Sequence, residues 1–336
     1  MADETDVAAA ENEPPKKKIT RPRAGLFATA LLVTIVLVAL PFAIRSMVVE
    51  LFGKQQDALY DLATNTIVPA GVAAIDGSEA HYYNIAIVSI SETAGTATLA
   101  VSGNRECPGE CATVTITLFA LDDNAAQRRG LPPSASITLQ PEDLAFSESV
   151  TLPIRGRPSM YPFDTYELWL GFAATAKNAA GQTVPVDPQR IKEKFVFTLQ
   201  NQDSGLVMQP PYRIDPAQVT AATDPDLLPL VEALEFQRPD YIKVLSVLLV
   251  LLITVSGGIA LATRSIDDLV LGVGGLILGI WGVRSVLVTQ PLPGISAVDL
   301  ALSLVILFLL LGLAIRLVRH FHRQSDLPVR WPVRKA

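Results

Sequence analysis

The sequence predicts a protein that is α-helical inside a membrane and all-β outside it. Long apolar segments are arranged one before and three after a polar middle. Within that middle, from about residue 80, the spacing of apolar residues changes from helix-like to strand-like. We therefore expect four transmembrane helices in a 1+3 arrangement, with an extracytoplasmic antiparallel β-sandwich between the first and the second helix.

The first predicted span covers residues 24–45. It contains an uncharged run of 21 residues, Ala24 to Ile44, which is long enough to cross a hydrocarbon core of about 30 Å. A cleaved signal peptide is the alternative, but the apolar core of such a peptide is usually only about 7 to 15 residues long. We therefore expect a retained anchor. Before it, residues 1–23 begin with an acidic, alanine-rich stretch and predict a disordered cytoplasmic tail.

Three further spans are predicted at residues 243–264, 268–289 and 295–316, followed by a basic tail at residues 317–336. Lysine and arginine gather before the first span and after the last one. Because positively charged flanks remain in the cytoplasm, both termini are expected there. Residues 46–240 then lie outside the cell membrane.

The segment predicted to lie outside is acidic, with 24 acidic and 12 basic residues between positions 46 and 240. Such a surface argues against nucleic acid and anionic lipid headgroups as its partner. Two explanations remain, a merely solvated surface and a surface that binds an unidentified extracytoplasmic ligand or protein.

The outer segment contains about seven short runs rich in β-branched and aromatic residues, separated by turn residues. In one of them Val114, Ile116 and Leu118 alternate with threonines, which predicts one buried and one solvated face. The expected sandwich covers residues 80–201, and the proline-rich segment 202–240 is expected to be a connector back to the membrane. The expected strands are residues 82–90, 95–101, 112–121, 134–139, 149–154, 166–173 and 193–200.

Between the first span and the strands, apolar residues recur near helical spacing. Leu51, Leu59, Tyr60 and Leu62 can share one face, so a helix is expected over residues 48–65. It continues the first span, lies on the membrane surface or packs on the outer domain.

The least generic stretch is the YPFD motif at residues 161–164, which leads directly into an alternating strand. Proline lacks an amide hydrogen and disfavours helix at the preceding residue, so the strand is expected to start from a turn. The aspartate is expected to accept backbone hydrogen bonds in that turn, and Arg155 and Arg157 are candidate partners of its carboxylate. The motif is either a corner that fixes the strand or a contact for a ligand or partner. Its residues are Tyr161, Pro162, Phe163 and Asp164.

These residues carry a resemblance. The YPFD motif, "FQRPDY" at residues 236–241, "GVRSVLV" at residues 282–288 and the apolar last span resemble an uncharacterised family of bacterial membrane proteins. The resemblance covers most of residues 25–320. It implies one helix, an outer domain and three helices in the cytoplasmic membrane of a bacterium. It implies no activity, because the function of that family is unknown.

An aromatic-Pro-Phe-Asp motif also occurs in the membrane-facing loop of pentameric ligand-gated channels. In those receptors the outer domain precedes all four helices, and in many of them cysteines bracket the motif. Here one helix comes first, and the cysteines lie far upstream, at positions 107 and 111. The similarity is therefore local.

The two cysteines, Cys107 and Cys111, are expected to form a disulfide, because they lie outside the membrane, where disulfides persist. The bond would staple the turn before the strand that starts at Ala112. Their spacing is not that of a Cys-x-x-Cys redox motif, and a metal site needs more ligands than this pair offers.

Four glycines in the third span recur at spacings of 3, 4 and 3, which places them on a narrow arc of one helix face. Another backbone can approach this flat face closely. Internal packing against the second span, with Ser256, Gly257 and Gly258 as candidate partners, is preferred over homo-oligomerisation through the same face. The four residues are Gly272, Gly275, Gly279 and Gly282.

The last two spans carry one charge each, Arg284 and Asp299. Both lie a short distance from the link between these spans, so they have a similar depth and are expected to pair. Pairing removes much of the free-energy cost of an intramembrane charge. A structural ion pair is the first interpretation, and separate snorkelling or an ion or proton pathway are the alternatives.

No catalytic motif accompanies these features. His81 is the one histidine expected outside, and His320 and His322 belong to the basic end of the last span. The sequence contains no nucleophile elbow, metalloprotease helix, phosphate loop or dinucleotide fingerprint. We therefore expect a non-catalytic integral membrane protein without a cofactor, which displays its β-sandwich for ligand or partner binding or for envelope assembly. An oligomeric channel or transporter using Arg284 and Asp299 is the alternative, and a membrane-anchored enzyme comes third.

Overall fold

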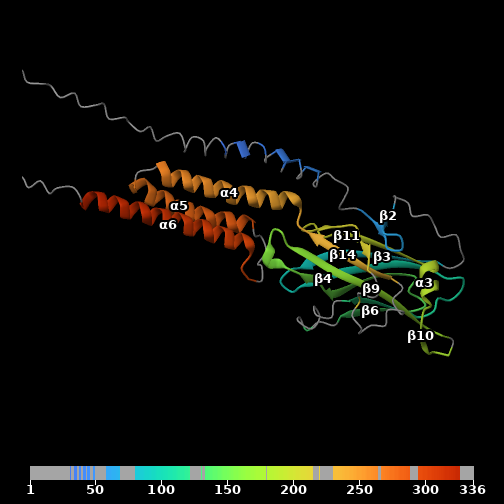
Figure 1. Cartoon of the computed structure of the whole chain (residues 1–336). Coiled ribbons are helices and arrows are strands. Elements are labelled where there is room, and N and C mark those ends of the chain that lie inside the picture. Colours follow the sequence, from blue (N-terminus) through green and yellow to red (C-terminus); the bar gives the residue numbers. More distant parts are fainter. Residues whose placement is uncertain are drawn as a thin grey trace, which may run out of the picture.

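The computed structural model describes residues 58–68, 80–121, 130, 133–178, 180–214, 219, 230–263, 266–287 and 294–325, and ten single positions between residues 31 and 49. It combines a β-sandwich with three long helices that extend side by side from one end of the sandwich (Figure 1). This is the predicted division into an all-β part and a helical part. The predicted N-terminal tail and the last residues of the basic C-terminal tail lie outside the described residues.

The sandwich consists of two sheets. The first has the strand order β2-β1-β11-β3-β4-β7, and the second has the order β12-β14-β9-β5-β6, with β8 and β10 on β9 and β13 on β14. Each of the seven expected strand segments forms a strand. The bounds are β1 Tyr60–Asp61, β2 Thr66–Ile67, β3 Ala80–Ser91, β4 Thr96–Glu106, β5 Val114–Ala120, β6 Ser134–Leu139, β7 Ala145–Pro153, β8 Arg155–Gly156, β9 Thr165–Lys177, β10 Thr183–Pro185, β11 Phe195–Asn201, β12 Val207–Met208, β13 Tyr212–Arg213 and β14 Leu230–Gln237.

The core lies between the two sheets, where alternate residues of each strand meet. In β5, Val114, Ile116 and Leu118 are buried. Thr115, between them, faces outward and its hydroxyl contacts the Thr138 hydroxyl on β6 at 3.1 Å. The predicted orientation of this strand is confirmed, and β9 alternates in the predicted way as well.

The first sheet is not purely antiparallel, which corrects the predicted fold. β11 pairs with β3 in the parallel direction. After β10 the chain leaves the second sheet through the short helix α3 (Pro188–Lys194) and enters the first sheet beside β3. Parallel neighbours need such a crossover connection, whereas hairpins produce antiparallel ones.

The predicted connector, residues 202–240, is also wrong. Its last part forms β14, which lies between β12 and β9 and pairs with β9 along its whole length. The prolines that suggest a connector all precede β14, whose own sequence, LVEALEFQ, contains none. The segment therefore completes the second sheet before the helices begin.

The helix expected over residues 48–65 is wrong for its second half. Tyr60 begins a short strand, and the Leu62 amide donates to the Phe197 carbonyl at 3.0 Å. Tyr60 and Leu62 both pack in the sandwich core. The two residues are two positions apart, so in an extended chain both side chains point to the same face, which is not the spacing of a helix face. Residues 51–57, which include the expected Leu51 contact, lie outside the described residues.

Three helices in the described part of the chain are long and apolar enough to cross a membrane, which indicates membrane association. They are α4 (Asp240–Thr263), α5 (Ile266–Leu287) and α6 (Ala297–Ser325). They correspond to the last three predicted spans. The predicted first span lies mostly outside the described residues, although the positions described between residues 31 and 49 are helical.

The expected internal packing of the glycine face of α5 is wrong. A Cβ added at Gly275, Gly279 or Gly282 would meet no atom within 4 Å, so α4 and α6 do not cover this face. α5 packs instead through leucine, valine and isoleucine side chains. The close approach occurs between the other two helices, where a Cβ added at Gly257 of α4 would lie 2.4 Å from Leu309 of α6.

Candidate functional site

The sandwich and the helices are joined by a link of two residues, Arg238 and Pro239, between the end of β14 and the start of α4. The Arg238 side chain is only 11% exposed. A buried guanidinium needs opposite charges and hydrogen bonds to compensate for its lost hydration. The residues that supply them define a site that we call the junction cluster. It consists of Glu92, Tyr161, Asp164 and Arg238.

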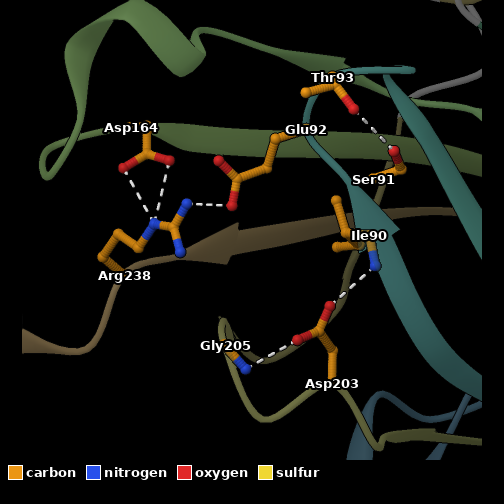
Figure 2. Close-up of polar contacts among 8 residues, drawn as sticks. All are labelled: Ile90, Ser91, Glu92, Thr93, Asp164, Asp203, Gly205 and Arg238. Atoms are coloured by element: carbon orange, nitrogen blue, oxygen red, sulfur yellow. Dashed lines mark hydrogen bonds and ion pairs between the residues drawn. The ribbon is translucent and has the colours of Figure 1, made fainter. Parts of the chain in front are cut away.

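Asp164 provides the first compensating charge. The Arg238 Nε donates to both of its carboxylate oxygens, at 3.2 Å to Oδ1 and 3.1 Å to Oδ2 (Figure 2). Asp164 is fully buried. The predicted pairing with Arg155 or Arg157 is wrong. Asp164 pairs with Arg238 instead, both nearby arginines are exposed, and Arg155 of β8 is the strand partner of Glu167 of β9. The carboxylate thus binds a guanidinium distant in sequence, not the backbone amides of its own turn.

Glu92 provides the second charge from the turn between β3 and β4. The Arg238 Nη2 donates to the Glu92 Oε1 (Figure 2). Asp203 holds the neighbouring segments in place, because its carboxylate accepts from the Ile90 amide at 2.8 Å and from the Gly205 amide at 2.7 Å. Since the β3–β4 turn belongs to the first sheet and the YPFD loop to the second, Arg238 binds both sheets at once.

The YPFD loop rests on the helices through its aromatic residues. The Tyr161 ring lies 4.9 Å from the Arg238 guanidinium carbon and packs in a cluster that otherwise consists of helix side chains, among them Val298 of α6. The peptide bond between Tyr161 and Pro162 is cis. Phe163 is half exposed.

Close packing behind the loop fixes the start of β9. The ring of the buried Tyr166 lies so close to Gly156 of β8 that a Cβ added there would be 2.2 Å from the Tyr166 Cδ1. Burial raises the pKa of the Tyr166 hydroxyl, and the charges of Asp164 and Glu92 raise it further. Tyr166 therefore stays neutral beside the cluster.

The charge of Arg238 is maintained by its neighbours. Burial by itself lowers the pKa of Arg238, but the carboxylates of Asp164 and Glu92 outweigh burial and the net pKa is raised. The guanidinium is therefore always ionised. The cluster is accordingly suited to serve as a permanent ionic link, not as a site that donates or accepts a proton.

A cavity of about 640 Å³, which we call the junction cavity, lies beside the cluster. Its walls include Arg238 and Asp240 from the link, Asn201 and Gln209 from the sandwich, and Phe42 from nearer the N-terminus. Small-ligand sites typically have about 300–1,000 Å³. The mixture of charged, amide and apolar walls suits a ligand with both polar and apolar parts.

The two charges expected in the last two spans, Arg284 and Asp299, are paired with each other. Arg284 of α5 donates through Nε and Nη2 to the Asp299 carboxylate on α6. The same carboxylate accepts from the Ser296 amide at 3.1 Å and from its hydroxyl at 2.9 Å, while the Asp299 amide donates to the Ser296 Oγ at 3.2 Å. This reciprocal arrangement is a capping box at the start of α6. Its Ser-x-x-Asp pattern is present in the sequence and could have been used to predict it.

At the end of the sandwich away from the helices, Cys107 and Cys111 form a disulfide between β4 and β5. The neighbouring Arg105 is buried and donates to the Gln140 carbonyl at 2.9 Å and to the Ala112 carbonyl. This region is a structural corner.

Other candidates for chemistry are built into the core. His81 is buried, with its ring 4.7 Å from that of Phe195. The described residues include no group of three or more histidine, cysteine or acidic side chains that could hold a metal ion. The junction cluster, between the sandwich and the helices, is therefore the candidate functional site.

Residues 129–223 match the model of a known protein family. The family is a domain of unknown function, DUF4436. The DUF4436 region contains the YPFD loop and Asp164, whereas Glu92 and Arg238 lie outside it. The expected resemblance to an uncharacterised family is confirmed for these residues. No curated protein matches the chain.

Proposed function

We propose that this chain is a non-catalytic integral membrane protein that holds a ligand- or partner-binding β-sandwich in a fixed position on a bundle of membrane helices. The junction cluster carries this proposal. One buried arginine, two residues before α4, binds carboxylates from both sheets. Such a link couples any displacement of the sandwich to α4, because separating the partners would leave buried charges uncompensated.

The proposed location is the cytoplasmic membrane of a bacterium, with both termini in the cytoplasm and the acidic sandwich outside. The basic residues that flank the first and last predicted spans support this orientation. The disulfide supports it as well, because disulfides persist in oxidising compartments. The bacterial origin rests on the motif resemblance.

The junction cavity is the proposed place of ligand binding. A ligand there would touch Arg238 and both parts of the molecule, so binding would act on the coupling element directly. The expected ligand is a small amphipathic molecule, because the cavity has charged and amide groups beside apolar walls.

An ion pathway through Arg284 and Asp299 has less support. The capping box and the ion pair account for both side chains without any conducting role. Proteoliposomes that contain the full chain are expected to show the same ion flux as empty liposomes. Flux above that level, altered by Arg284→Ala, would contradict the proposal in favour of a channel or transporter.

Coupling is tested by pulsed electron-spin distance measurements on the full chain in lipid nanodiscs. Spin labels are placed at two exposed positions, Ser136 on the sandwich and Val318 on α6. The distance distribution is expected to be narrow, and to broaden when the cluster is neutralised by Glu92→Gln, Asp164→Asn and Arg238→Met together. Arg155→Met, at an exposed position, is the control and should leave the distance distribution narrow. A wild-type distribution as broad as that of the neutralised variant would refute the coupling.

Binding is tested by thermal shifts in a screen of small amphipathic molecules. A true ligand should stabilise the wild-type chain and lose its effect in Gln209→Trp, which fills the junction cavity. Gln189→Trp, exposed on α3 at the far end of the sandwich, is the control. If the ligand still raises the unfolding temperature of Gln209→Trp, the binding site is not the junction cavity. A specific turnover that is lost in His81→Ala would contradict the non-catalytic assignment.

A further inference from the structure

A second cavity, of about 430 Å³, lies between the YPFD loop and the helices α4 and α6. Pro162 and Phe163 form its side toward the sandwich, Val250 of α4 and Ala301 of α6 are among its walls, and the lining is almost entirely apolar. Its volume is within the range of about 300–1,000 Å³ for small-molecule sites. We call it the helix cavity.

The position of the helix cavity defines its surroundings. It is bounded by α4 and α6, two helices that are long and apolar enough to cross a membrane. On α4 it extends from residue 246 to residue 255, which is about 14 Å along the helix axis. If α4 and α6 cross a membrane, this stretch of α4 faces the hydrocarbon layer. The groups that can enter the cavity from that layer are lipid acyl chains.

One polar side chain in the wall lacks a partner. Ser246 is 2% exposed, lines the helix cavity, and its hydroxyl has no hydrogen bond among the described residues. Thr254, two turns further along the same wall, differs because its hydroxyl donates to the Val250 carbonyl at 2.7 Å. A buried hydroxyl without a partner is unfavourable, so the occupant of the cavity is expected to present a hydrogen-bond acceptor to Ser246.

We propose that the helix cavity binds an acyl chain of an ester-linked phospholipid from the leaflet on the sandwich side, with the Ser246 hydroxyl donating to the ester carbonyl. The ester group is the acceptor that a phospholipid carries at the boundary between headgroup and hydrocarbon. Because the bound chain contacts Phe163, one residue before Asp164, the lipid stabilises the loop that forms the junction cluster.

The test is native mass spectrometry of the full chain titrated with dipalmitoyl phosphatidylcholine or with its dihexadecyl ether analogue, which lacks the ester carbonyls. The wild type is expected to bind the diester lipid about fivefold more tightly, the usual effect of one hydrogen bond. Ser246→Ala should remove this preference. Ser256→Ala, an exposed serine of α4 outside the cavity, should keep it.

A second variant tests whether the acyl chain binds in the helix cavity, independently of the Ser246 hydroxyl. Val250→Phe fills the cavity and should weaken the binding of both lipids, whereas Leu252→Phe, exposed on the same helix, should not. Equal binding of the two lipids by the wild type, or a preference that survives in Ser246→Ala, would overturn the proposal. Unchanged binding in Val250→Phe would do so as well.

Discussion

At the scale of single residues, Arg238 is the side chain on which the junction depends. Arginine suits this position because its planar fork binds two carboxylates and its face packs on an aromatic ring. Both uses occur here, the first with Asp164 and Glu92 and the second with Tyr161. The burial of the cluster makes it sensitive, since the loss of one partner leaves charge where water cannot reach it.

Arg238→Ala is expected to lower the free energy of unfolding by about 3–5 kcal/mol, the usual effect of breaking a buried ion pair. Asp164, fully buried, and Glu92 would be left without their counter-charge. Urea unfolding of the full chain in detergent, followed by tryptophan fluorescence, measures the change.

Two variants show whether the effect belongs to the cluster. Replacing Arg238 by Met together with Asp164→Asn and Glu92→Gln should recover most of the lost stability, because no buried charge remains. Arg155→Ala removes one of the two exposed arginines that the sequence offers as partners of Asp164, and should change stability by less than about 0.5 kcal/mol. A loss of several kcal/mol for Arg155→Ala would contradict the assigned pairing.

Gly156 is a second residue whose identity matters, because a larger side chain does not fit at its position. A Cβ at this position would lie 2.2 Å from the Tyr166 ring, so Gly156→Ala is expected to destabilise the chain by about 1–3 kcal/mol through overpacking. Gly109→Ala is the matched control, because a Cβ there meets no atom within 4 Å. Thermal unfolding of both variants gives the comparison, and equal stability would show that Tyr166 moves aside freely.

At the scale of elements, one strand leads directly into one helix. β14 is paired on both sides within the second sheet, and α4 begins after a link of only two residues. A link this short gives α4 little freedom relative to the sandwich. The start of α6 is fixed in a different way, by a capping box whose aspartate also binds α5.

Asp299 belongs both to the cap of α6 and to the ion pair with Arg284, so the two members of the pair are unequal. Asp299→Ala removes both the cap and the ion pair, and loss of a cap alone costs about 0.5–2 kcal/mol. Arg284→Ala leaves the capping box with Ser296 intact and should be clearly milder. Thermal unfolding in detergent ranks the two variants.

Ser296→Ala is the companion variant, because it disturbs the cap while leaving both charges of the pair. It should be intermediate, and the double variant Arg284→Ala, Asp299→Ala should resemble Asp299→Ala alone. An Arg284→Ala variant as unstable as Asp299→Ala would mean that the ion pair, not the cap, dominates.

At the scale of the whole molecule, a buried carboxylate connects the two sheets away from the junction. Glu232 of β14 accepts from the side-chain Nδ2 of Asn65, in the β1–β2 turn, at 2.8 Å and from the Arg213 Nε at 3.3 Å. Burial raises the pKa of Glu232, and these two partners reduce the shift without cancelling it. The folded state therefore holds this proton more tightly than the unfolded chain does.

This pKa predicts how global stability depends on pH. A carboxyl group whose folded pKa is raised favours the folded state at low pH, and that contribution is lost as pH rises from the ordinary value of 4.5 through the folded pKa. In Glu232→Gln this fall should be absent. Urea unfolding between about pH 4 and pH 8 measures it. Glu148→Gln, exposed on β7, should behave like the wild type, and equal slopes for wild type and Glu232→Gln would contradict the prediction.

The sequence by itself determined the features that depend on local pattern. Apolar runs of membrane length predict the last three helices, because a bilayer accepts only segments that satisfy their own backbone hydrogen bonds. Alternation within β5 and β9 predicts their buried faces, because successive side chains of a strand point in opposite directions. The cysteine spacing predicts the disulfide, and similar depth predicts the pairing of Arg284 with Asp299.

Only the tertiary structure decided which distant segments meet. Asp164 has two arginines nearby in sequence and binds a third that is 74 residues away, because the fold brings the YPFD loop and the end of β14 to the same edge of the sandwich. The parallel register of β11, the inclusion of β14 and the packing of α4 and α6 away from Gly275, Gly279 and Gly282 of α5 have the same origin. Each depends on which surfaces bury the most apolar area and compensate the most charge when all elements are assembled, and no local pattern contains that sum.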